Sequence, residues 1–182
     1  MIRIALLASA IALICSQAFA QDAVDEADAA LVPPPIVMST EHPDEEAVEP
    51  YARSNANAGT TPFEGTAMYE AFHGEAGVGR IVDGMVDRSV ADPRISAIFL
   101  ASDLVRLRRT LKEQFCYILG GGCAYSGRDM VAAHATMGAQ AADMGALVEN
   151  LQTAMSAEGV PFATQNRFLA KLAPMRRDVI TR

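Results

Sequence analysis

The sequence predicts an all-α domain, and three observations support this prediction. Between residues 78 and 179, apolar residues recur every three or four positions, the spacing that places them on one face of a helix. Proline and glycine separate these periodic stretches, as expected where helices end. No stretch of useful length alternates apolar and polar residues, as a half-buried strand would. With 182 residues, 51% of them hydrophobic and 20% charged, the chain is long enough for one domain with a buried core.

Residues 1–20 have the layout of a secretory signal peptide. Arg3 precedes an apolar run over residues 4–14, and the small residues of A-F-A at 18–20 fit a cleavage site before Gln21. A retained membrane anchor is the alternative, but the run is shorter than the ~20 residues that span a bilayer comfortably. We therefore expect an exported, periplasmic or secreted protein with no membrane span after cleavage.

Residues 21–61 are predicted to form a disordered, acidic, Pro-rich tether. Residues 21–50 contain nine acidic residues and neither Lys nor Arg, and prolines at 33–35, 43 and 50 interrupt any helix. Low hydrophobicity combined with high net charge is typical of a disordered segment. The alternative is an acidic motif that binds a partner. The folded domain is expected over residues 62–182.

The net charge of −7 comes mainly from this tether. Residues 51–182 carry 14 basic and 13 acidic residues, which leaves them at +1. Neither part has the basic surface that nucleic-acid binding requires, so we expect no nucleic-acid partner.

Two helices are expected in the first half of the domain. One over about residues 78–90 ends at Asp92-Pro93, because the residue before proline avoids the α region. Its apolar positions are Val78, Ile81, Val82, Met85, Val86 and Val90. The next starts at Ser102 or Asp103, both good N-caps, and stops at the glycines of 120–122. Its apolar stripe consists of Leu104, Leu107, Leu111, Phe115 and Ile118.

Two further helices are expected in the second half. One covers about residues 141–157 and ends at Gly159. The last starts at Pro161, a position that tolerates proline, and is bent at Pro174. The chain lacks the motifs G-x-S-x-G, H-E-x-x-H and C-x-x-C and the Walker loop, which argues against a conventional hydrolase or nucleotide enzyme.

His134 is the most informative single residue. It lies in a short helical stretch, with Met130 one turn before it and Met137 one turn after it. A lone histidine near an apolar face is more often a hydrogen-bonded structural residue than a ligand. However, a neutral imidazole in an apolar slot also holds haem iron in globins. Apolar walls for a porphyrin are available on the helix that carries Leu107, Leu111 and Phe115, and helix bundles bind cofactors between facing helices.

Residues 69–180 resemble the group I truncated globins. The most specific motif is Y-S-G-R-D-M-x-x-A-H at 125–134. Shorter motifs follow the family's order and spacing: H-G-E-A-G-V at 73–78, A-D-P-R-I at 91–95, D-L-x-R-L at 103–107, Gly-Gly at 120–121 and G-V-P at 159–161. The resemblance implies a two-on-two helical sandwich around haem b (iron protoporphyrin IX), in an exported, proteobacterial-type member.

The resemblance also assigns site residues. It places His134 as the proximal ligand of the haem iron and Phe99 as the ring packed on the haem face. The other expected haem contacts are Leu107, Leu111, Phe115, Met130, Tyr125 and Arg106. Tyr125, Arg106 and Arg109 are candidates for the haem propionates, since Arg suits carboxylates. A solvated helix face is the alternative for each arginine.

The expected distal ligand pocket departs from the family pattern. It comprises Met85, Val86, Leu107, Leu111 and Gln114. Many members have Phe-Tyr where this chain has Met85-Val86, and Gln where Leu111 stands. Losing a hydrogen bond of ~1–2 kcal/mol weakens O₂ binding roughly tenfold or more, so we expect fast O₂ release and low discrimination between gases. Gln114 either replaces the missing donor or only satisfies backbone near the glycine turn.

Cys116 and Cys123 are a candidate disulfide. They bracket the glycine turn, seven positions apart, and an exported protein folds in an oxidising compartment. The alternative is a reduced, packed pair.

Three functional classes remain open. The preferred one is a haem protein that reversibly binds O₂, NO or CO. The second is a haem redox enzyme, a nitric oxide dioxygenase or a weak peroxidase. Because the sequence shows no reductase domain, that enzyme would need a periplasmic electron donor. The third is a haem-free helical binding module.

Overall fold

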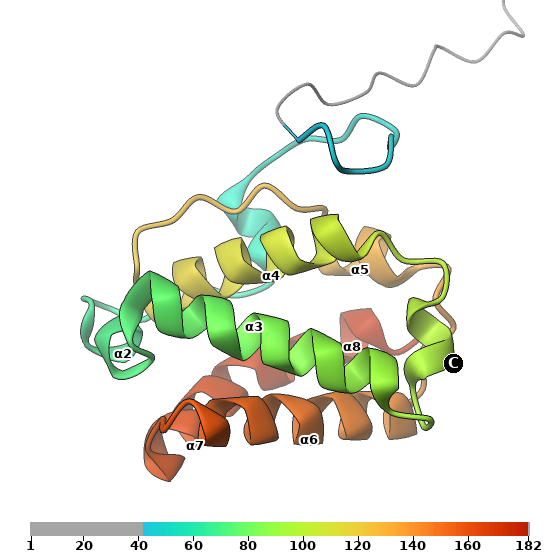
Figure 1. Cartoon of the computed structure of the whole chain (residues 1–182). Coiled ribbons are helices and arrows are strands. Elements are labelled where there is room, and N and C mark those ends of the chain that lie inside the picture. Colours follow the sequence, from blue (N-terminus) through green and yellow to red (C-terminus); the bar gives the residue numbers. More distant parts are fainter. Residues whose placement is uncertain (1–41, 182) are drawn as a thin grey trace, which may run out of the picture. The chain divides into compact units, whose positions relative to one another are not determined.

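Helices α3 and α4 lie side by side and face a second helical layer (Figure 1). The computed structural model describes residues 42–181; the predicted signal peptide and the first part of the predicted tether lie outside them. The α-helices are α2 (Ala67–Ala71), α3 (Gly74–Ala91), α4 (Leu104–Leu119), α5 (Met130–His134), α6 (Ala141–Ala157), α7 (Phe162–Leu172) and α8 (Arg176–Val179). The 3-10 helices among these residues are η2 (Asn55–Ala58), η3 (Ser96–Phe99) and η4 (Ala173–Met175). The all-α prediction is confirmed for this part of the chain.

The helix termini follow the expected signals. Asp103 caps α4, because its side chain accepts hydrogen bonds from the backbone N–H groups of Val105 and Arg106, both at 3.0 Å. Gly120 ends α4 in the left-handed conformation, with φ 87°. A Cβ at this position would lie 2.1 Å from the backbone oxygen of Gly65, so glycine is needed here. Instead of one bent final helix, the chain forms α7, the turn η4 that contains Pro174, and α8.

The helices enclose an aromatic core near the start of α3. The ring of Phe168 packs edge-to-face against Phe72 and Phe115, with centroid distances of 5.1 and 4.9 Å. Ile118 and Met155 are fully buried beside them. The core holds α3, α4, α6 and α7 together at one end, which leaves the opposite ends of these helices to form the cavity described below.

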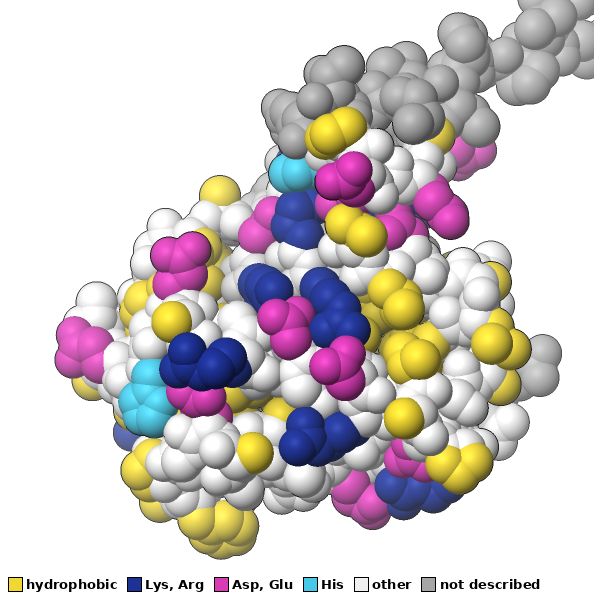
Figure 2. Space-filling model, viewed as in Figure 1, with side chains coloured by type: hydrophobic (Ala, Val, Ile, Leu, Met, Phe, Trp, Pro, Cys, Tyr) yellow, Lys and Arg dark blue, Asp and Glu magenta, His cyan; other side chains and the backbone are white. Residues whose placement is uncertain are grey.

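Ion pairs join α3 and α4 on the surface. Asp83 of α3 accepts from Arg108 at 3.2 Å and from Lys112 at 2.9 Å. Figure 2 shows the resulting mixture of basic and acidic side chains on this face. These exposed pairs orient the helices but stabilise the fold only modestly. No helix among residues 42–181 is long and apolar enough to cross a bilayer.

Residues 42–61, here called the N-terminal strap, differ from the prediction. Composition assigns them to a disordered tether, but the structure packs them onto the helical domain. The side chain of Glu45 is only 3% exposed, and it forms ion pairs with Arg106 and Arg109 of α4. Ala58 is fully buried in the core. The composition argument fails because the cations that neutralise Glu45 lie more than 60 positions away in the sequence.

Polar side chains of the strap also bind the connection between α4 and α5. Tyr51 donates its hydroxyl to the backbone oxygen of Ser126 at 3.0 Å. Asn57 donates to the backbone oxygen of Gly127 at 3.2 Å, and Asn55 accepts from the backbone N–H of Tyr125 at 2.8 Å. The strap therefore fixes the segment that leads into α5.

Candidate functional site

A cavity of about 720 Å³ lies among α4, α5, α6 and the C-terminal helices. Its lining is mostly apolar and includes Phe115, Met130, Met137, Leu151 and Leu169. A smaller hollow of about 120 Å³ adjoins it and extends toward α3 and η3. The two share lining residues on α3, α4, α5 and α6, so they form one continuous apolar site.

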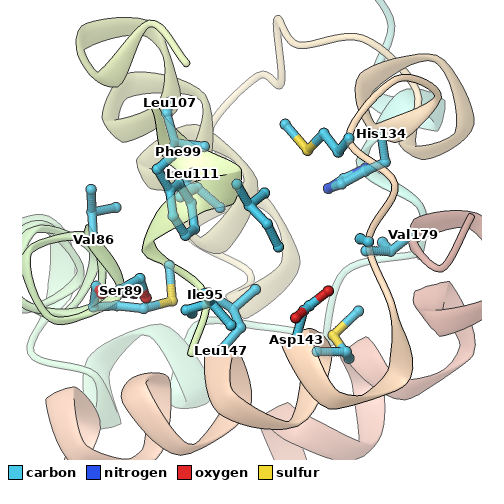
Figure 3. A pocket seen from close by; sticks show the side chains of 15 residues that line it. Val86, Ser89, Ile95, Phe99, Leu107, Leu111, His134, Asp143, Leu147 and Val179 are labelled. Carbon is cyan, nitrogen blue, oxygen red and sulfur yellow. Dashed lines mark hydrogen bonds between the residues drawn. The ribbon is translucent and has the colours of Figure 1, made fainter. Parts of the chain in front are cut away.

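His134 ends the short helix α5 and lines both hollows. Asp129 caps this helix by accepting from the backbone N–H of Ala132 at 2.9 Å. The His134 Nδ1 atom lies 2.7 Å from the backbone oxygen of Met130. Since a carbonyl only accepts, Nδ1 carries the proton, and the lone pair of a neutral ring is on Nε2. Figure 3 shows the ring pointing into the hollow, where Nε2 can bind a metal ion in a fixed tautomer.

The wall across from His134 is aliphatic and aromatic. Figure 3 shows Val86, Phe99, Leu107 and Leu111 on the opposite side of the smaller hollow. Met85, the neighbour of Val86, is buried and lines both hollows. All five are residues that the sequence assigned to the site, and the fold brings them to one place.

Ser89 is a lining residue that the sequence analysis missed. Its side chain is buried in the smaller hollow, and its hydroxyl donates to the backbone oxygen of Met85 at 2.8 Å. The helical spacing could have identified it, because Ser89 lies three positions after Val86 and so falls on the same face of α3. As its proton is already donated to the helix backbone, Ser89 adds little hydrogen-bonding capacity to the hollow.

Gln114 is buried and lines the larger cavity, but its amide is engaged elsewhere. Nε2 donates to the backbone oxygen of Ala58 in the strap at 2.9 Å. The sulfur atoms of Met130 and Met175 lie 3.5 and 3.9 Å from the same nitrogen. In this structure the Gln114 amide therefore hydrogen-bonds a backbone carbonyl, and this carbonyl belongs to the strap and not to the glycine turn.

The structure separates Tyr125 from the two arginines. Tyr125 lines the larger cavity and donates its hydroxyl to the backbone oxygen of Arg128 at 3.0 Å, and burial raises its pKa to about 12. Arg106 and Arg109 line neither hollow, because both bind Glu45. The Arg109 guanidinium, assisted by Arg106, holds the pKa of the Glu45 carboxyl below its usual range.

The structure joins Cys116 and Cys123 in a disulfide, with their Cα atoms 5.7 Å apart. Of the two alternatives for this pair, the bonded one is present. The bond anchors the chain after the glycine turn to α4, next to Phe115 in the cavity wall.

Comparison with known proteins gives a consistent result. A family model described as bacterial-like globin matches residues 67–181. A group 1 truncated hemoglobin of Mycolicibacterium paratuberculosis is 28% identical over 118 residues, covering 65% of this chain and 87% of its own length. A group 1 truncated hemoglobin of Tetrahymena pyriformis is 26% identical over 113 residues, covering 62% and 93%.

Solved structures show the same similarity. The truncated hemoglobin of Tetrahymena pyriformis in its Fe(III) form has a TM-score of 0.61 at 26% identity and covers 63% of this chain and 98% of that one. A 2/2 hemoglobin of Synechococcus sp. PCC 7002, solved in the cyanomet state with covalently attached heme, has a TM-score of 0.58 at 26% identity, with the same coverage. The family match contains every lining residue of both hollows and leaves the strap outside it.

Proposed function

Because this chain belongs to the bacterial-like globin family, we propose that it binds haem in the cavity beside His134 and carries a diatomic gas on the haem iron. The observation that carries this proposal is the state of His134. Its Nδ1 donates to Met130 at 2.7 Å, which leaves Nε2 free at an apolar cavity. A neutral imidazole presented in this way is the proximal ligand that globins use.

The cavity fits the proposed cofactor. Haem is a large, mostly apolar ring, and the cavity of about 720 Å³ is mostly apolar. Phe115 and Leu151 form part of its buried wall, and Phe99 offers a ring on the side opposite His134. Apolar walls of this kind exclude water from an iron centre.

The residues have distinct roles in this proposal. When bound, the haem iron supplies an open coordination position that takes O₂, NO or CO. His134 would hold the iron through Nε2, and the carbonyl of Met130 keeps its ring in the required tautomer and makes it more basic. Val86 and Leu111 would meet the gas with methyl groups that donate no hydrogen bond. We therefore propose a gas-binding protein with fast O₂ release and low discrimination between gases.

We also propose that the protein is exported and that cleavage precedes Gln21. The Cys116–Cys123 disulfide supports this, because structural disulfides persist in oxidising compartments and are rare in the cytosol. The mass of the protein recovered from its native host tests the proposal. A mature chain that starts at Gln21 supports export, whereas an intact chain that starts at Met1 contradicts cleavage.

The central experiment is haem reconstitution of the purified protein. We expect a Soret band at one haem per chain. In His134→Ala we expect loss of the spectral signal of five-coordinate iron bound to the proximal histidine. Added imidazole should restore that signal by entering the space left by the ring. The matched control is His73→Ala, since His73 is half-exposed outside the cavity and binds Glu158 at 3.0 Å. Absence of a Soret band in the unaltered protein would leave only a haem-free binding module.

A further inference from the structure

Arg176, at the start of α8, is the only Lys or Arg residue between 42 and 181 that lines the larger cavity. The residue is exposed, and no hydrogen bond or ion pair within these residues involves its guanidinium. The acidic lining residue Glu149 does not neutralise it, because Glu149 binds Arg94 at 2.7 Å. This mostly apolar cavity thus has one cationic side chain without an ion-pair partner among residues 42–181.

The backbone holds Arg176 in place. The backbone oxygen of Arg176 accepts from the N–H of Ile180 at 3.1 Å, and the N–H of Thr181 donates to the oxygen of Ala139 at 3.0 Å. Helix α8 also packs against α5, which carries His134. The backbone of Arg176 therefore has a fixed position relative to the helix that carries the proposed iron ligand.

Two arginines of α4 bind a different carboxylate, that of Glu45. Arg106 donates to Glu45 at 3.1 Å, and Arg109 donates to both oxygens of the same carboxylate. Recruiting either arginine to another anion would leave the buried Glu45 short of partners, which is costly for a buried charge. These two arginines therefore hold the strap on α4 through their ion pairs with Glu45.

We propose that Arg176 binds a carboxylate of the bound haem at the cavity mouth. The inference rests on the proposed haem binding and identifies the residue that anchors the polar edge of the cofactor. Haem b carries two propionate carboxylates, which are charged at neutral pH. Burying these charges in an apolar cavity is costly, so the propionates must face the mouth. A guanidinium matches a carboxylate with two parallel N–H donors, and Arg176 is the only arginine among residues 42–181 that lines this cavity.

The rate of haem loss to an excess of apomyoglobin tests the proposal. Arg176→Ala should release haem about 1.5-fold to fivefold faster than the unaltered protein, the range expected for an exposed ion pair. Arg177→Ala is the matched control, because Arg177 is the exposed neighbour and lines neither hollow. Arg177→Ala should release haem at the original rate, and Arg176→Lys should be intermediate.

Two further measurements separate an ion pair from a structural effect. With haem dimethyl ester, which lacks the carboxylate charges, Arg176→Ala and the unaltered protein should release the cofactor at the same rate. At about 1 M salt the difference with haem should shrink, because exposed charges are screened. Thermal unfolding of each apoprotein confirms that the variants fold.

Several results would overturn the inference. An unchanged rate of haem loss in Arg176→Ala would do so, as would an equal acceleration with the dimethyl ester. Faster loss in Arg106→Ala, with Arg176→Ala unaffected, would return the role to α4. Failure of the proposed function is distinct from these outcomes, because the unaltered protein would then show no Soret band.

Discussion

The guanidinium of Arg109 donates to both carboxylate oxygens of Glu45, although 64 positions of the chain separate the two residues. The Arg109 Nη2 atom lies 2.9 Å from Glu45 Oε2, and Arg106 shares that oxygen. This ion cluster attaches an acidic segment to α4 and, through the strap, to the segment that leads into α5.

Glu45→Gln should destabilise the protein. The change removes the negative charge from a side chain that is 3% exposed, and it leaves Arg106 and Arg109 with only Asp103 and Glu113 as anionic partners. We expect the free energy of unfolding in urea to fall by about 1–3 kcal/mol. Glu49→Gln is the control in the same strap, because Glu49 is exposed, and it should change the stability little. Equal effects of the two variants would show that the strap is not held by Glu45.

Gln114→Leu should affect stability more than gas binding. The amide donates to Ala58 at 2.9 Å, so its removal leaves a buried carbonyl without that donor and should cost about 1 kcal/mol. Stopped-flow measurement of O₂ dissociation should give a rate within about twofold of the original. A several-fold faster rate would instead show that the Gln114 amide stabilises bound O₂.

Leu111→Gln should slow the release of O₂. The variant places an amide donor on the aliphatic wall opposite His134, where the polarised O₂ ligand gains from a hydrogen bond. A gain of about 1.4 kcal/mol would slow O₂ dissociation about tenfold, with a smaller effect on CO. Leu111→Met is the control, since it keeps the volume and adds no N–H donor. If O₂ dissociation is the same in both variants, Leu111 does not face the gas ligand.

Stability should decrease at acidic pH partly through Glu158. Hydrogen bonds from Arg80 and His73 lower the pKa of this carboxyl to about 2 from its usual 4.5. A group with a lowered folded-state pKa stabilises the fold fully above about pH 4.5, and that contribution is lost as the pH falls toward 2. In Glu158→Gln the loss of stability across this interval should be smaller. Urea unfolding at several pH values checks this, with exposed Glu64→Gln as the control; identical slopes in all three proteins would rule Glu158 out.

The sequence by itself determined the helices and much of the proposed site. The turn-to-turn spacing on α3 and α4 and the stop signals at Pro93 and Gly120 act within one or two helical turns, so a local pattern contains them. The same spacing places Leu107 and Leu111 on one face of α4, and both line a hollow together with Val86 and His134. The family match confirms the globin resemblance that the motifs around these residues indicated.

Only the tertiary structure decided which charges meet. The composition of an acidic segment without basic residues predicts that it is solvated, but the fold places Arg106 and Arg109 beside Glu45. The same contacts occupy these two arginines, which the sequence alone leaves as candidates for binding the cofactor. The tertiary structure also decides the partner of Gln114, because Ala58 lies 56 positions away in the sequence. It likewise decides that Arg176 lines the cavity, through the packing of α8 on α5. Helical periodicity is a property of neighbouring residues, so a local sequence pattern reveals it. An ion pair forms between whichever charged groups the fold brings within about 4 Å, and their separation along the chain does not predict which groups will meet.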